Sequence, residues 1–334
     1  MRLLKAIVYF LYILFGSILG TELGLRLTGY GPLDITVASE EQKTRFIPPF
    51  TRDPLSGWTL LPGTFELLLA KRDRRSLITI NQDSSRITSN HSVTERATSS
   101  GIVFIGDSYT FGEGLDNNET MAWQVQQQLP EINVYNFGVP GYGTCQSWLR
   151  VRKLLSNGIR ANVLVYGFSD FHEERNILAP QMDWVTAIRN STGSSEYPRC
   201  YIAGSSIVVE APRDWSLLIS LARRSALAKS LVGIWLSLLE DSANSRRLTE
   251  ALLLELNALS KKHGSTFLVF LQDLSIESHR HYVKFFTDNR IPYSDGSTEL
   301  ANGQHRLPDG HPGPETNRAW AEKIVADVQR LGTL

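Results

Sequence analysis

The segment "VFIGDSYTFGEG", residues 103–114, joins an apolar run to a glycine-rich turn through Gly106, Asp107 and Ser108. The apolar run is short and continuous, as expected of a strand that is buried on both faces of a parallel sheet. Loops at strand ends commonly carry chemistry. Ser108 is therefore a candidate nucleophile, and its alternative role is that of a turn or helix-capping serine.

The pattern around this segment predicts an alternation of strands and helices from residue 101 onward. Apolar runs predict strands at 101–106, 132–139, 161–168, 266–272 and 291–295, and helical patterns fall at 119–129, 146–155, 246–264 and 314–331. Such an alternation favours a parallel sheet with helices on both faces. We expect a three-layer α/β/α sandwich with a flavodoxin-like sheet.

The N-terminus is basic at Arg2 and Lys5 and then apolar and uncharged over residues 6–20. This length is marginal for a bilayer span, which takes about 20 apolar residues. A cleaved signal peptide is the alternative, but "GSILGTELG" offers no good A-x-A site. We favour an uncleaved anchor at 1–27, and the preceding positive charges predict a cytoplasmic N-terminus and an exported catalytic domain, periplasmic or extracellular.

Residues 28–100 differ from the rest of the chain because short β-type runs alternate with Pro, Gly and Asn-Gln-Asp. We expect a small β-rich preface there, followed by one α/β domain at 101–334. Residues 214–241 are an extra apolar segment with basic residues. We favour a helix packed over the core or the site, and the alternative is a surface helix that dips into the membrane.

Composition narrows the possible partners. The chain of 334 residues has 34 Lys+Arg and 34 Asp+Glu, so its formal charge is zero and nothing favours nucleic acid. Its two cysteines, Cys145 and Cys200, could form a disulfide in an exported protein or remain separate thiols. The sequence has no Cys/His cluster with zinc spacing, so we expect neither a metal nor an organic cofactor.

Ordered motifs give the chain a resemblance to the SGNH, or GDSL, hydrolase family, in the form of its membrane-anchored bacterial members. "IGDSYTFGEG" resembles the block that carries the nucleophile, and "NFGVPGYGT" the block whose glycine donates to the oxyanion. "VLVYGFSDF" takes the place of the third block, and "PDGHP" resembles the block that supplies the base and its acid. By this resemblance the catalytic residues are Ser108, His311 and Asp309, and the oxyanion hole comprises the backbone of Ser108 and Gly141.

The chemistry needs these residue types. A serine hydroxyl is a poor nucleophile without an adjacent base, and histidine is the usual base. A carboxylate on the other imidazole nitrogen fixes the tautomer and orientation. By contrast, we expect His172 to be a solvated loop residue and Glu173–Arg175 to be a solvated charge run.

The chain departs from the family pattern at two positions. Where the third block usually has asparagine as an oxyanion donor, this chain has Ser169, whose side chain is shorter and offers a single O–H donor. Asn176 is a possible substitute for the missing asparagine. The acid stands two residues before His311, at Asp309, and not three. The first departure leaves open a catalytically silent glycan-binding or scaffold protein.

The resemblance implies a serine esterase that acts on O-acyl, and more specifically O-acetyl, esters of an extracellular or envelope glycan. An O-acyltransferase with the same triad is the alternative, because the sequence does not tell water from a sugar hydroxyl as acceptor. A lipid esterase is a third possibility, suggested by residues 214–241. The expected partners are thus an acylated glycan and, through the N-terminal segment, the lipid bilayer.

Overall fold

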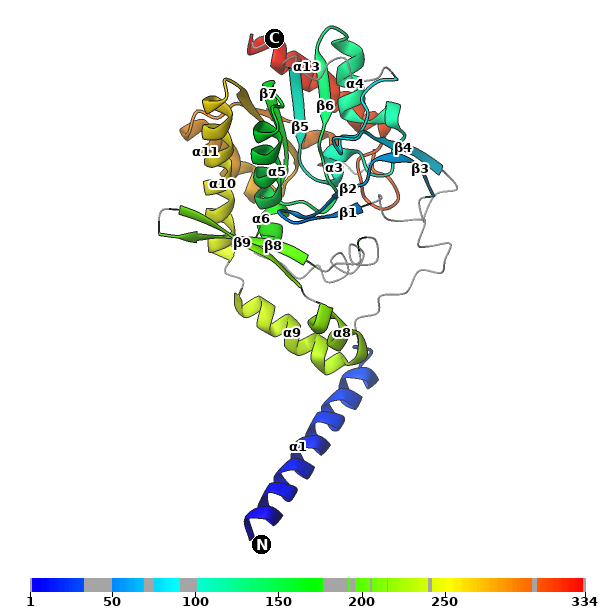
Figure 1. Cartoon of the computed structure of the whole chain (residues 1–334), viewed down its shortest axis with the longest axis vertical. Coiled ribbons are helices and arrows are strands. Elements are labelled where there is room, and N and C mark those ends of the chain that lie inside the picture. Colours follow the sequence, from blue (N-terminus) through cyan, green and yellow to red (C-terminus); the bar gives the residue numbers. More distant parts are fainter. Residues whose placement is uncertain are drawn as a thin grey trace.

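The computed structural model describes residues 2–32, 50–68, 75–90, 101–176, 192, 196–204, 206–214, 216–239, 242–301 and 305–332 (Figure 1). Its centre is a five-stranded parallel sheet of order β6-β5-β7-β10-β11. In chain order the strands are β5 (Gly101–Ile105), β6 (Asn133–Asn136), β7 (Ala161–Ser169), β10 (Thr266–Asp273) and β11 (Tyr293–Asp295). Numbered from β5, this is the 2-1-3-4-5 order of flavodoxin-like folds. The fold class predicted from the sequence is confirmed.

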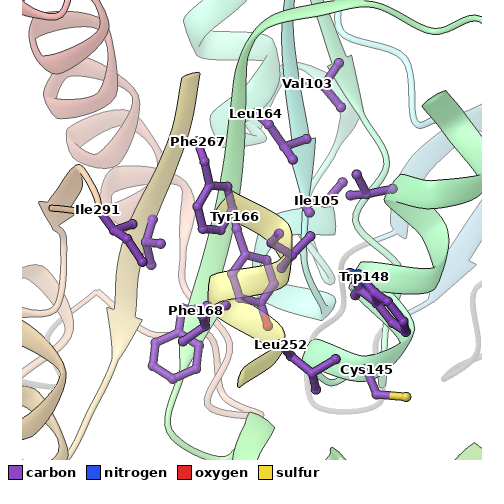
Figure 2. Packing of buried hydrophobic residues seen from close by; sticks show 14 of the residues in the cluster. Val103, Ile105, Cys145, Trp148, Leu164, Tyr166, Phe168, Leu252, Phe267 and Ile291 are labelled. Atoms are coloured by element: carbon purple, nitrogen blue, oxygen red, sulfur yellow. The ribbon is translucent and has the colours of Figure 1, made fainter. Parts of the chain in front are cut away.

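Helices cover both faces of the sheet, because successive side chains of a strand point to opposite faces. On one face, Val103 and Ile105 pack with Trp148 and Leu252 (Figure 2). The helices on this face are α5 (Thr144–Ser156), α10 (Ser242–Lys262) and α11 (Ile276–Asp288).

On the other face, Ile102 and Phe104 pack with Met121 and Trp320. The helices there are α4 (Met121–Gln128) and α13 (Pro314–Arg330). Proline at the first position of α13 suits a helix start, where its missing N–H costs nothing. All five residues of β5 are buried, as its continuous apolar run predicts.

The segment before the sheet forms two antiparallel hairpins, as its β-type pattern predicts. The strands are β1 (Phe50–Asp53), β2 (Gly57–Leu60), β3 (Gly63–Leu68) and β4 (Arg75–Ile80). Trp58 of β2 is fully buried, and its Nε1 donates to the Pro140 carbonyl at 3.0 Å. The β1–β2 hairpin therefore contacts the loop that follows β6.

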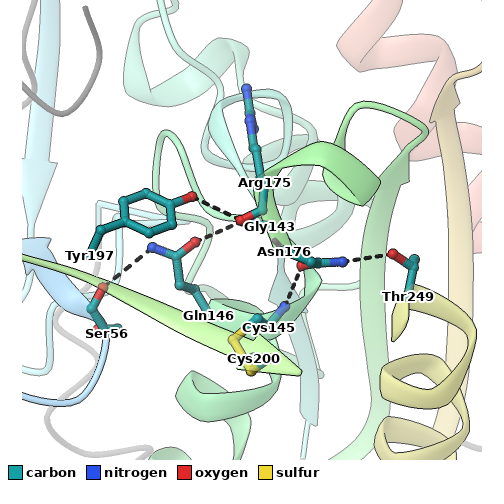
Figure 3. The surroundings of a disulfide bond; sticks show 9 residues. All are labelled: Ser56, Gly143, Cys145, Gln146, Arg175, Asn176, Tyr197, Cys200 and Thr249. Carbon is teal, nitrogen blue, oxygen red and sulfur yellow. Dashed lines mark hydrogen bonds between the residues drawn. A yellow bond between two sulfur atoms is a disulfide. The ribbon is translucent and has the colours of Figure 1, made fainter. Parts of the chain in front are cut away.

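An antiparallel hairpin of β8 (Glu196–Ala203) and β9 (Ser206–Asp214) lies between β7 and α10 in the chain, and the sequence analysis did not foresee it. Cys200 of β8 forms a disulfide with Cys145 of α5 (Figure 3). This bond resolves the alternative that the sequence left open, and it fastens the hairpin to the helix beside the site.

Residues 214–241 contain two helices, α8 (Ser216–Arg224) and α9 (Ala226–Leu239), and the N-terminus forms α1 (Arg2–Leu27). Residues 5–27 of α1 are long and apolar enough to cross a membrane. α1 projects from the rest of the molecule, with α8 and α9 at its C-terminal end (Figure 1). Both membrane anchors and signal sequences have this length and composition.

Candidate active site

The candidate nucleophile stands where β5 ends. Gly106 has φ of +149°, a conformation that residues with a Cβ rarely adopt, and a Cβ there would collide with the Thr110 hydroxyl. Ser108 then begins the short helix α3 (Ser108–Phe111), with Asp107 as its N-cap. The Asp107 carboxylate accepts from the Tyr109 N–H at 3.0 Å. Glycine and aspartate thus fix the sharp turn that aims Ser108 away from the strand.

The end of β6 and the segment after it are hydrogen-bonded to this turn. The Asn136 amide donates to the carbonyls of Thr110 and Phe111 at 3.2 and 3.3 Å, and the Val139 N–H donates to Gly106 O at 3.0 Å. A Cβ on Gly138 would lie 2.5 Å from the Phe111 nitrogen, so only glycine allows this approach. Gly141, with φ of +83°, follows two residues after Val139.

The preface supports the same turn through Arg86. This guanidinium is buried, donates to the carbonyls of Phe111, Gly112 and Leu115 at 3.1, 2.7 and 2.6 Å, and lies over the Phe111 ring. Burial lowers its pKa to about 9. The sequence pattern did not single out Arg86, because most of its partners are backbone carbonyls, about which the spacing of side chains says nothing.

The structure brings His311 to Ser108. His311 Nε2 lies 3.1 Å from Ser108 Oγ, within hydrogen-bond reach, although 203 residues separate them. Asp309 Oδ1 lies 3.4 Å from His311 Nδ1 and accepts from the His311 backbone N–H at 3.1 Å. The 3.4 Å contact is longer than a formed hydrogen bond, and catalytic contacts are often loose without substrate.

The loop that carries His311 is held by Arg306, which the sequence analysis did not identify. Arg306 Nη1 donates to Gly310 O at 2.9 Å, and Nη2 pairs with Asp273 at 3.0 Å. The Tyr109 ring packs edge-on against the His311 ring, with 5.4 Å between ring centroids. The strand end of β10 and the helix of the nucleophile therefore both position the imidazole.

A second carboxylate, Glu113, faces the same imidazole and was not foreseen. Its Oε2 lies 3.7 Å from His311 Nε2, and only 13% of its side chain is exposed. Burial raises the pKa of Glu113. Burial by itself would lower the pKa of His311, but Glu113 and Asp309 raise it to about 9. Glu113 is part of the nucleophile motif, in the segment "FGEG", but the sequence does not show that its side chain faces His311.

The third block stands at the same edge. Ile105 of β5 pairs with Tyr166 of β7, so Ser108 and Ser169 each follow three residues beyond paired positions. Ser169 is fully buried, and among the described residues its hydroxyl has no hydrogen-bond partner. An unpaired buried hydroxyl costs about 1–3 kcal/mol, so the Ser169 hydroxyl keeps a donor that no described residue uses.

One expectation about the segment after β7 is wrong, and one possibility is not realised. His172, expected to be solvated, is fully buried in α6 (His172–Asn176); its Nδ1 lies 2.8 Å from the Tyr166 hydroxyl and its Nε2 3.3 Å from Asp107. Asn176 does not serve as an oxyanion donor, because its Oδ1 accepts from Cys145 N and its Nδ2 donates to Thr249 (Figure 3). Both side chains are structural.

The expected charge run at 173–175 is also only partly solvated. Glu173 accepts from the Tyr282 hydroxyl at 2.6 Å and from Arg246 at 3.1 Å, whereas Glu174 is exposed. Arg175 pairs with the buried Asp107 at 3.0 Å. Burial by itself would raise the pKa of Asp107, but His172 and Arg175 lower it to about 2. Asp107 therefore braces the nucleophile turn as an anion.

Comparisons with known proteins give structural neighbours only. No family model matches the chain, and no curated protein does. The solved structures that it resembles include G-D-S-L proteins.

Three of these structures show the extent of the likeness. A member of the lipolytic protein G-D-S-L family from Veillonella parvula has a TM-score of 0.40 and 12% identity over 70% of this chain and 100% of its own. The psychrotrophic esterase EstA from Pseudoalteromonas sp. has a TM-score of 0.40 and 10% identity, over 71% of this chain and 100% of its own. TesA has a TM-score of 0.40 and 13% identity, over 69% of this chain and 99% of its own.

Proposed function

We propose that the chain is a serine esterase that cleaves O-acyl esters with Ser108 as nucleophile, His311 as general base and Asp309 as the acid that orients His311. The observation that carries this proposal is the contact of 3.1 Å between Ser108 Oγ and His311 Nε2, with Asp309 on the other ring nitrogen. An imidazole in this position can take the hydroxyl proton as the new bond forms.

The reaction proceeds in two halves. Ser108 Oγ attacks the ester carbonyl while His311 Nε2 takes its proton, and the tetrahedral oxyanion accepts from backbone N–H groups of Ser108 and Gly141 and from the Ser169 hydroxyl. The C–O bond to the alcohol breaks and His311 returns the proton to it. Water then attacks the acyl-enzyme through the same base, releasing the acid and restoring Ser108.

We further propose that the substrate is an O-acetyl ester on an extracellular or envelope glycan, as the family resemblance of the motifs suggests. The disulfide between Cys145 and Cys200 supports an exported domain, because such bonds persist in oxidising compartments. The apolar α1 supports attachment to the membrane at the N-terminus.

The test is acetate release by the full chain in detergent micelles, from p-nitrophenyl acetate and from an O-acetylated polysaccharide. Ser108→Ala should abolish both activities, and Ser156→Ala, on the exposed last turn of α5, should retain them. Activity on the small ester alone would support the esterase mechanism and contradict the O-acetylated glycan as substrate. Turnover by Ser108→Ala would refute the mechanism.

A further inference from the structure

The helices α8 and α9 expose apolar side chains at the end of the molecule that carries α1. They bury Ile219 of α8 and Val232 of α9, whose side chains are 0% and 9% exposed. Leu217, Leu221 and Leu231 are instead 70%, 46% and 57% exposed. The pair therefore has a packed side and a second apolar side that faces outward.

This helix pair is joined to α1 by specific hydrogen bonds. The Glu22 carboxylate accepts from the backbone N–H groups of Ala226 and Leu227 at 3.1 and 2.9 Å, and from the Ser225 hydroxyl at 2.8 Å. A carboxylate at a helix N-terminus satisfies free N–H groups and complements the helix dipole. The start of α9 is thereby fixed to the last turns of α1.

The hydrogen bonds at Glu22 determine how far α8 and α9 lie from the apolar stretch of α1. The apolar stretch of α1 ends at Leu27, only five residues beyond Glu22. If α1 crosses a bilayer of ordinary thickness, Glu22 and Arg26 lie at the membrane–water interface. The start of α9, which they contact, lies there too.

The charge of the pair also fits a membrane surface. Residues 216–239 contain Arg223, Arg224 and Lys229 and no acidic residue. Arg223 and Arg224 are exposed, and Lys229 lies over the Tyr30 ring, 4.7 Å from its centroid. Basic residues beside exposed leucines are typical of helices that lie in the headgroup region of anionic membranes.

We propose that α8 and α9 lie in the interface of the same bilayer that α1 crosses, with Leu217, Leu221 and Leu231 in the acyl boundary and the basic residues at anionic headgroups. The inference rests on the membrane placement of α1, not on the chemistry of the site.

This placement has a consequence for the candidate active site. α3 and α6, which follow the carboxyl ends of β5 and β7, lie on the side of the sheet that faces α8 and α9 (Figure 1). Ser108 is thus held on the membrane side of the domain.

The experiment places an environment-sensitive NBD label on the full chain in vesicles of phosphatidylcholine with phosphatidylglycerol. Both native cysteines are in the disulfide, so single cysteines can be labelled without reduction. The sites are Leu221→Cys and Leu231→Cys, with Ile13→Cys in α1 as the insertion control and Arg330→Cys in α13 as the aqueous control. Quenching by doxyl-labelled lipid is compared with quenching by aqueous iodide.

We expect doxyl lipid to remove most of the emission at 221 and 231, as at 13, whereas iodide quenches only the label at 330. Replacing both Arg223 and Arg224 with Gln should reduce lipid quenching at 221 and leave that at 13 unchanged. Iodide quenching at 221 and 231 equal to that at 330 would overturn the proposal while α1 remains inserted. Protection from both quenchers would also overturn it, because a protein would then cover this face. Failure at position 13 would refute the placement of α1 itself.

Discussion

At the scale of single residues, the site contains more charge than a Ser-His-Asp triad requires. Glu113 and Asp309 lie on opposite nitrogens of His311, at 3.7 and 3.4 Å. A second negative charge favours the imidazolium and so delays the appearance of the free base as pH rises. We therefore expect Glu113 to raise the pH at which His311 becomes a free base.

We predict that Glu113→Gln moves the ascending limb of kcat/KM to lower pH. The pKa of His311, raised to about 9, should fall by about one unit or more toward its ordinary value once the neighbouring charge is gone. The measurement is the pH profile of p-nitrophenyl ester hydrolysis. Glu66→Gln, in an exposed ion pair of β3, serves as the control. An unchanged limb in Glu113→Gln would show that Glu113 does not act on the base.

The buried hydroxyl of Ser169 allows activity to be separated from stability. If it donates to the oxyanion, Ser169→Ala should lower kcat by about 10² with little change in KM. Because the hydroxyl has no partner in the described structure, its removal should leave the free energy of unfolding unchanged or raise it by about 1 kcal/mol. Loss of stability together with unchanged kcat would assign Ser169 a purely structural role.

The motifs predicted the contact between Ser108 and His311, because each motif occupies a loop at the carboxyl edge of a parallel sheet. They did not predict Arg306 or His172. Arg306 pairs with Asp273, which is 33 residues away, and His172 is buried by Tyr166 and Asp107. Contacts of this kind arise from how the loops fold over one another, and the polarity of His172 alone favoured a solvated position.

At the scale of elements, the strands with continuous apolar runs were the easiest to predict. The hairpin of β8 and β9 was missed, although Gly204 stands at its turn with φ of +63°. Its strands have mixed polarity because the hairpin lies outside the sheet. The apolar pattern of residues 214–241 predicts one helix, whereas Ser225 separates α8 from α9.

The disulfide gives the hairpin a measurable role. Cys145 and Cys200 are 55 residues apart, and a cross-link that closes such a loop stabilises by about 4 kcal/mol in the chain-entropy description. We predict that replacing both cysteines with serine lowers the free energy of unfolding by up to that amount, measured by urea denaturation of the full chain in micelles. Equal stability of both forms would contradict a structural role for the bond.

At the scale of the whole molecule, the chain has one helix suited to crossing a bilayer among its described residues, and α8 and α9 lie at its end. α3 and α6, at the carboxyl ends of β5 and β7, lie on the side of the sheet that faces that end (Figure 1). This arrangement would present the site to esters close to the membrane surface.

We predict that the expressed chain remains in the membrane fraction after carbonate extraction and retains its N-terminus. An uncleaved anchor keeps Arg2 and Lys5 attached to the domain, whereas a signal peptidase would remove them. Intact mass of the purified protein decides between the two. A mass that starts after the apolar stretch would identify a signal peptide and refute the anchor.

The central claim is that Ser108 is an activated nucleophile, and reaction of the full chain with a fluorophosphonate tests it most directly. We predict one covalent adduct, mapped by peptide mass to Ser108, that forms in Ser156→Ala and is absent in His311→Ala. A folded chain that gains no adduct, or an adduct on another residue, would contradict the claim.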